Sequence, residues 1–180
     1  QVLADSEMRR TLMTDTLDEL SDDIFKSSSI YTLTNKYKPE IIIDCINTAT
    51  AIAYQDVYTS YREIKSLFAK NPEKEVVMKA TEQLLCTLYI PQLIRHIQVL
   101  YNAMLESGTK AYVKIGTSGT GGMGLNIPYT HSEERPSRVL LSKSSVAGAH
   151  TLLLFLMGRT PEAPIIKEIK PTAAIAWKQI

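Results

Sequence analysis

The stretch Ile41-Ile42-Ile43-Asp44-Cys45-Ile46 decides the fold class of this chain. A short, continuous run of β-branched residues is typical of a strand that is buried on both faces of a parallel sheet. Lys38-Pro39-Glu40 comes directly before it and ends a helical pattern, because a residue that precedes proline disfavours the helical conformation. We therefore predict a central strand over residues 41–46.

Two later runs predict two more strands, over Ala111–Ile115 and Ala163–Ile169. Long helical patterns precede and separate the three strands, at residues 8–20, 22–38, 54–68, 73–106 and 137–159. Pro91 lies inside the fourth pattern and is expected to kink it or split it in two. Strands joined by helical crossovers of this length are parallel neighbours, covered by helices on both faces. The predicted fold class is therefore α/β.

Composition and charge exclude several classes of protein. The chain has 180 residues, of which 44% are hydrophobic and 22% charged, with a formal net charge of +1, as in one ordinary soluble domain. Lys and Arg are scattered, which argues against nucleic acid as a partner, and no apolar run reaches the roughly 18 residues of a membrane span. Cys45 and Cys86 lie in apolar segments, which suits buried, reduced thiols in a cytoplasmic protein, and no Cys/His grouping has the spacing of a zinc site.

The loops that follow the three strands are the expected place for chemistry. Ligands of parallel α/β sheets bind beyond the carboxyl ends of the strands. In this chain those ends lead into residues 47–50, 116–124 and 171–174. We expect the three loops to converge on one site.

A glycine-rich run, Gly119-Thr120-Gly121-Gly122-Met123-Gly124, matches the dinucleotide-binding pattern G-x-G-x-x-G letter for letter. In that pattern the last glycine opens a helix that meets the pyrophosphate, but here Leu125-Asn126-Ile127-Pro128 follows instead. A Walker P-loop is excluded as well, because no Gly-Lys-Ser/Thr closes the run. Two interpretations stay open: a flexible loop without a ligand, and backbone that approaches a ligand closely.

Four segments carry a resemblance to a known family: residues 38–49, 102–108, 117–119 and 141–143. Their order and spacing resemble the middle of an extended short-chain dehydrogenase/reductase of the nucleotide-sugar epimerase/dehydratase type, over about residues 25 to 175. The resemblance implies an incomplete Rossmann-like parallel sheet with helices on both faces, and NAD or NADP as the cofactor. It also implies that residues 1–180 form a single, truncated domain without the family's first strand and glycine fingerprint. Residues 1–38 would be a helical lead-in, and residues 39–180 the sheet, crossover helices and active-site loops.

The resemblance also assigns the site residues. Ser118 falls where the family has the hydroxyl that holds the substrate oxygen, and Lys143 where it has the lysine that binds the nicotinamide ribose and lowers the pKa of the catalytic tyrosine. Val139 stands four residues before Lys143, in the place of that tyrosine, so Tyr129 or His131 would have to carry the proton. The expected cofactor contacts are Asn47, Thr48, Ala49, Gly116, Thr117 and Lys143.

Two functions remain open at this point. The first is an NAD(P)-dependent oxidoreductase or epimerase/dehydratase that acts on a small-molecule substrate. The second is a catalytically inactive nucleotide-binding or assembly protein that keeps the fold without the tyrosine, and Val139 is the residue that separates them. The resemblance further implies a homodimer through residues 73–106. We expect His96 on the surface or at an interface, and His150 in the core.

Overall fold

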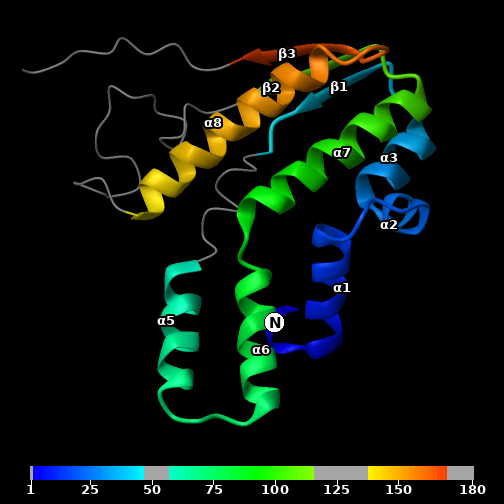
Figure 1. Ribbon diagram of the computed structural model, residues 1–180. Helices are drawn as coiled ribbons and strands as arrows, with labels where there is room; N and C mark the ends of the chain where they lie inside the picture. The colour runs from blue at the N-terminus through cyan, green and yellow to red at the C-terminus, as the bar shows by residue number, and fades with distance from the viewer. Residues whose placement is uncertain (1, 47–56, 116–137, 170–180) are drawn as a thin grey trace, which may run out of the picture.

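The computed structural model describes residues 2–46, 57–115 and 138–169 (Figure 1). A 3-10 turn, η1 (Val2–Ala4), opens the chain and a helical region follows. The remaining elements in chain order are α1 (Ser6–Leu17), α2 (Asp22–Ser27), α3 (Ser29–Tyr37), β1 (Ile41–Asp44), α5 (Val57–Phe68), α6 (Lys74–Leu85), α7 (Tyr89–Ser107), β2 (Ala111–Ile115), α8 (Arg138–Gly158) and β3 (Ile165–Ile169).

The three strands form one parallel sheet in the order β1-β2-β3. Ile42 lies opposite Tyr112, and Tyr112 lies opposite Ile166. The register is thus unshifted: residues at the same position of each strand lie opposite one another. Parallel neighbours need a crossover connection, and the helices between the strands provide it. This confirms the predicted α/β class and the predicted parallel pairing of the first two strands.

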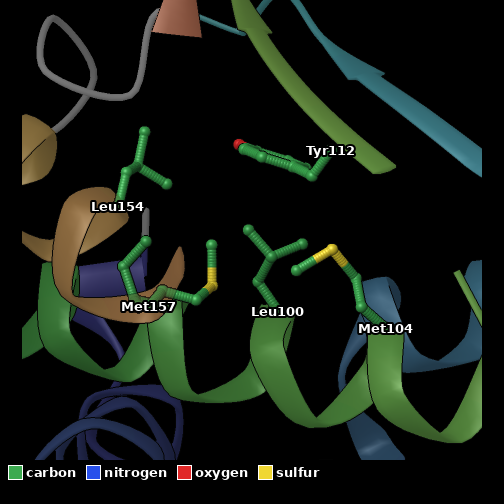
Figure 2. Packing of buried hydrophobic residues seen from close by; sticks show 6 residues of the cluster. Leu100, Met104, Tyr112, Leu154 and Met157 are labelled. Carbon is green, nitrogen blue, oxygen red and sulfur yellow. The ribbon is translucent and has the colours of Figure 1, made fainter. Parts of the chain in front are cut away.

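One face of the sheet is packed against helices α7 and α8 (Figure 1). Tyr112 points from β2 toward Leu100 and Met104 of α7 and toward Leu154 and Met157 of α8 (Figure 2). Tyr112 and Met104 are completely buried. Helix α3 packs on α7 and brings Ile30 to the same cluster. We call the face of the sheet that packs against α7 and α8 the inner face.

The opposite, outer face of the sheet corrects a prediction. Side chains of a strand alternate between the two faces, and the outward ones include Ile41 and Ile43 of β1, which are 59% and 65% exposed, and Ile165 and Ile169 of β3, which are 62% and 54% exposed. Within the three described ranges no helix covers this face. The prediction of helices on both faces, with the first strand buried on both, is therefore wrong for this part of the chain. A run of isoleucines indicates a strand, but it does not determine how many of its faces are covered.

Two predicted helices are divided in the structure. The pattern over 22–38 breaks at Ser28, whose hydroxyl caps α3 by accepting a hydrogen bond from the Tyr31 amide. The pattern over 73–106 is split after Leu85, as Pro91 predicted. Pro91 lies in the first turn of α7, where the missing amide proton has no partner within the helix.

The buried residues also test three smaller predictions. Cys86 and His150 are buried as expected, but Cys45 follows the end of β1 and is exposed, so the expectation for Cys45 is wrong. Along residues 73–106, Leu93, Ile97 and Leu100 are buried within the chain itself. The apolar side chains still exposed along this segment include Val76, Met78, Ile90 and Ile94.

Candidate functional site

A row of three charged residues crosses the inner face near the carboxyl ends of the strands. Asp44 of β1 lies opposite Lys114 of β2, and Lys114 lies opposite Glu168 of β3. The three residues occupy alternate positions to the outward side chains, so they share the inner face with Tyr112. The side chain of Lys114 is only 3% exposed and that of Asp44 11%. We call Asp44, Lys114 and Glu168 the charged row.

Asp44 is the centre of the hydrogen bonds in this row. Its Oδ2 accepts from Lys114 Nζ at 2.9 Å and from the Tyr112 hydroxyl at 2.6 Å. Its Oδ1 accepts from the Ile46 amide at 2.8 Å. Lys114 Nζ also donates to the Ile46 carbonyl oxygen at 2.6 Å. The row therefore connects β2 both to β1 and to the chain just beyond β1.

The other end of the row is tied to helix α8. The Thr151 hydroxyl, in the middle of that helix, lies 3.1 Å from Glu168 Oε1. Helix α8 is also the element that contains Lys143. The charged row thus links the end of the sheet with the helix that carries the predicted catalytic lysine.

The electrostatics of the site follow from burial and these hydrogen bonds. Burial acts to raise the pKa of Asp44, but the donors Tyr112, Lys114 and Ile46 outweigh it and hold that pKa below its usual value. Burial raises the pKa of Tyr112 strongly, and the hydrogen bond to the Asp44 carboxylate adds to the effect. Burial lowers the pKa of His96, although the nearby Asp44 opposes the shift. Near neutral pH, Asp44 is thus ionised, Tyr112 protonated and His96 neutral.

A groove of about 460 Å³ runs along the side of β1 that no strand of the described ranges pairs with, between β1 and helices α3 and α7. Most of its lining is apolar and includes Leu33 and Tyr37 of α3. Its polar lining includes Thr34, Asp44, His96 and Tyr112. The Nε2 atom of His96 is buried and has no hydrogen-bond partner in the described part of the chain. His96, expected on the surface or at an interface, is thus partly buried and lines a groove beside the strand end.

Most of the residues predicted for the site lie outside the described ranges. These are Asn47, Thr48, Ala49, Gly116, Thr117, Ser118, Tyr129 and His131. Lys143 lies in α8, but its side chain is also outside the described part of the structure. The structure does describe the points where the chain leaves the sheet toward these residues. Because β1 and β2 are parallel neighbours, the strand ends that precede residues 47 and 116 lie side by side at the carboxyl end of the sheet.

Sequence reasoning missed the charged row. Its signal was present, because each strand carries a charged residue at its fourth position: Asp44 in Ile-Ile-Ile-Asp, Lys114 in Ala-Tyr-Val-Lys and Glu168 in Ile-Ile-Lys-Glu. A charged residue at the same position of three adjacent apolar strands forms a row across the sheet when the register is unshifted. The pairing register of the three strands could not be derived from the sequence.

Comparisons with known proteins add no assignment: no family model, no curated protein and no solved structure matches this chain. In the described ranges, none of the helices has both the length and the apolar character needed to cross a membrane. The same residues contain no group of three or more His, Cys, Asp or Glu side chains arranged to hold a metal ion.

Proposed function

We propose that this chain is part of an NAD(P)-binding protein similar to the short-chain dehydrogenases/reductases, acting as an oxidoreductase or a nucleotide-sugar epimerase/dehydratase on a small-molecule substrate. One observation carries the proposal. The three strands are parallel, adjacent and in chain order, so the segments after β1, β2 and β3 all leave from one edge of the sheet, the one formed by the carboxyl ends of the strands. Such an edge is where α/β proteins of this kind bind nucleotides.

The register of β1 and β2 supports a ligand shared by the segments that follow these two strands. Asp44 and Lys114 lie in one register row, so the chain leaves β1 and β2 at neighbouring points. Asn47, Thr48 and Ala49 after one strand, and Gly116 and Thr117 after the next, would then contact the same ligand. When bound, the dinucleotide supplies a nicotinamide ring that accepts or donates a hydride.

The remaining roles belong to the chain's own side chains. Ser118 would hold the substrate oxygen by a hydrogen bond, and Lys143 would bind the nicotinamide ribose. Tyr129 or His131 would move the proton, since Val139 has none to give. Tyr112 cannot take over this role, because its hydroxyl is bound to Asp44 and its pKa is raised.

A second function is favoured by Val139. If no side chain replaces the missing tyrosine, the protein binds nucleotide without turning it over and serves as a sensor or an assembly subunit. Self-association would suit that role. Leu93, Ile97 and Leu100 are already buried within the chain. A homodimer through residues 73–106 would therefore use exposed apolar side chains of this segment, such as Val76, Met78, Ile90 and Ile94.

Calorimetry with NADH and NADPH on the purified protein, in its full natural length, tests both functions. We expect binding, and we expect Lys143→Met to weaken it by about tenfold or more because the ribose contact is lost. Lys70→Met, at an exposed position after α5, is the matched control and should leave binding unchanged. If neither dinucleotide binds the wild-type protein, both functions are wrong.

Hydride transfer to a simple ketone separates the two functions. Turnover by the wild-type protein would support the enzyme. Binding without turnover, together with activity gained in Val139→Tyr, would support the inactive nucleotide-binding protein. The gain is expected because that substitution restores a proton donor one helical turn before Lys143.

A further inference from the structure

We propose that Lys114 is a positioning residue, which acts together with Asp44 to hold the carboxyl end of β1 in the conformation that ligand binding requires. The inference rests on the proposed function for the nature of the ligand, but its structural basis is independent of it. Lys114 lies in β2, and within the described ranges both of its side-chain hydrogen bonds reach β1 or the residues just beyond it.

The backbone of Ile46 is what this pair fixes. Strand β1 ends at Asp44, so the pairing of β1 with β2 no longer holds Ile46. Its carbonyl oxygen accepts from Lys114 Nζ at 2.6 Å, and its amide donates to Asp44 Oδ1 at 2.8 Å. Both backbone polar groups of Ile46 are thus held by side chains. Ile46 directly precedes Asn47 in the sequence, the first predicted ligand contact.

The place of these charges in the sheet supports a role beyond stability. The neighbouring row on the same face consists of Ile42, Tyr112 and Ile166, so it carries no charge. Burying an ion pair costs desolvation energy, and well-packed apolar side chains of similar size often give equal or greater stability. Apolar side chains would therefore suffice to fill the space under α7 and α8. Apolar side chains could not make the hydrogen bonds that hold the Ile46 backbone as well.

The pair is also linked to neighbouring groups that limit its movement. The Tyr112 hydroxyl donates to the same Asp44 oxygen as Lys114, at 2.6 Å, and Tyr112 is completely buried. Side chains locked by packing and by further hydrogen bonds hold a binding geometry more closely than free ones.

Three variants of the full-length protein test this inference: Lys114→Met, the double variant Asp44→Asn with Lys114→Met, and Lys110→Met. The last is a matched control, because Lys110 forms an ion pair with Glu40 at the amino ends of the same two strands. The measurements are the dissociation constant for NADH or NADPH, hydrogen exchange of the Ile46 amide, and the midpoint of thermal unfolding.

We expect Lys114→Met to weaken dinucleotide binding by about tenfold or more and to speed exchange at Ile46. The substitution removes the donor to the Ile46 carbonyl oxygen, so the Ile46 backbone is held only through its amide. The double variant should regain thermal stability relative to Lys114→Met, since it no longer buries an unpaired carboxylate, but it should not regain affinity. Lys110→Met should change affinity by less than about twofold, because its ion pair is exposed.

Recovery of both stability and affinity in the double variant would overturn the inference, and so would unchanged affinity in Lys114→Met. If the wild-type protein binds neither dinucleotide, the proposed function fails. The exchange measurement still decides whether Lys114 holds the Ile46 backbone. Equal exchange at Ile46 in Lys114→Met and Lys110→Met would then overturn the inference by itself. If Lys114→Met does not fold, the double variant supplies the same comparison of affinity and exchange with the control.

Discussion

Two lysine–carboxylate pairs join β1 to β2, one at each end of the strands. At the amino end, Lys110 Nζ lies 2.6 Å from Glu40 Oε1, and both side chains are 71% exposed. At the carboxyl end, Lys114 Nζ lies 2.9 Å from Asp44 Oδ2, and the side chains are 3% and 11% exposed. The two pairs have the same charges and nearly the same length. They differ in burial, and the buried pair also makes hydrogen bonds to Tyr112 and Ile46.

That difference decides what each pair does. Water and salt screen the exposed pair, and holding two long side chains in one geometry costs entropy, so the pair contributes little. The buried pair is largely removed from water, so its charges are screened less and the loss of one partner leaves the other poorly compensated. The shorter distance thus belongs to the weaker interaction. Burial, rather than separation, determines which lysine shapes the edge where ligands are expected.

The largest expected effect compares the same substitution at the two ends. Lys114→Met leaves the Asp44 carboxylate buried without its cation and should lower the free energy of unfolding by about 3 kcal/mol or more. Lys110→Met should lower it by less than about 1 kcal/mol. Urea unfolding followed by circular dichroism measures both. Similar losses for the two variants would mean that burial does not distinguish the pairs.

The dependence of stability on pH gives a second comparison. The pKa of Asp44 is lowered in the folded protein from its ordinary value of 3.8. The unfolded state therefore takes up a proton first as the pH falls. The contribution of Asp44 is fully present above its unfolded pKa and is lost as the pH falls through its folded pKa.

Urea unfolding between pH 7 and pH 2 checks this expectation. The wild-type protein should lose stability below about pH 4, and Asp44→Asn should remove part of that loss. Glu40→Gln is the matched control at the exposed end, where screening by water keeps the effect small. A pH profile of Asp44→Asn that runs parallel to the wild-type profile would contradict the expected role of Asp44.

How much of this the sequence predicted follows from the range of each signal. The isoleucine run at 41–46, the helical patterns and Pro91 are local signals, and they predicted the α/β class, the parallel strands and the division between α6 and α7. The uncovered outer face was not predictable in this way, because Ile41 and Ile43 have the same β-propensity whether or not a helix covers them.

The charged row needed information that no local pattern contains. Asp44, Lys114 and Glu168 come from strands that are far apart in the sequence, and only the pairing register brings them together. A shift of one residue in any strand would move its charge to the outer face. Periodicity also said nothing of the hydrogen bonds from Asp44 and Lys114 to Ile46, because these depend on the path of the chain after β1 has ended.

The smallest expected effect compares two tyrosine hydroxyls. The Tyr112 hydroxyl donates to the buried Asp44 carboxylate at 2.6 Å, whereas the Tyr101 hydroxyl donates to the Pro161 carbonyl at 3.0 Å where water has access. Tyr112→Phe should lower the free energy of unfolding by about 1.5 kcal/mol, because Asp44 loses one of three donors, and Tyr101→Phe by less than about 0.5 kcal/mol.

Urea unfolding with an unchanged dependence on denaturant concentration would show that both tyrosine variants keep the native fold. The loss for Tyr112→Phe should also be smaller than that for Lys114→Met, because the carboxylate keeps both its cation and the Ile46 amide. If Tyr112→Phe instead cost as much as Lys114→Met, the hydroxyl rather than the lysine would be the main partner of Asp44. The positioning of the β1 end would then be a property of Tyr112, and the difference between the two ends of the strands would lie in the aromatic core instead of the ion pair.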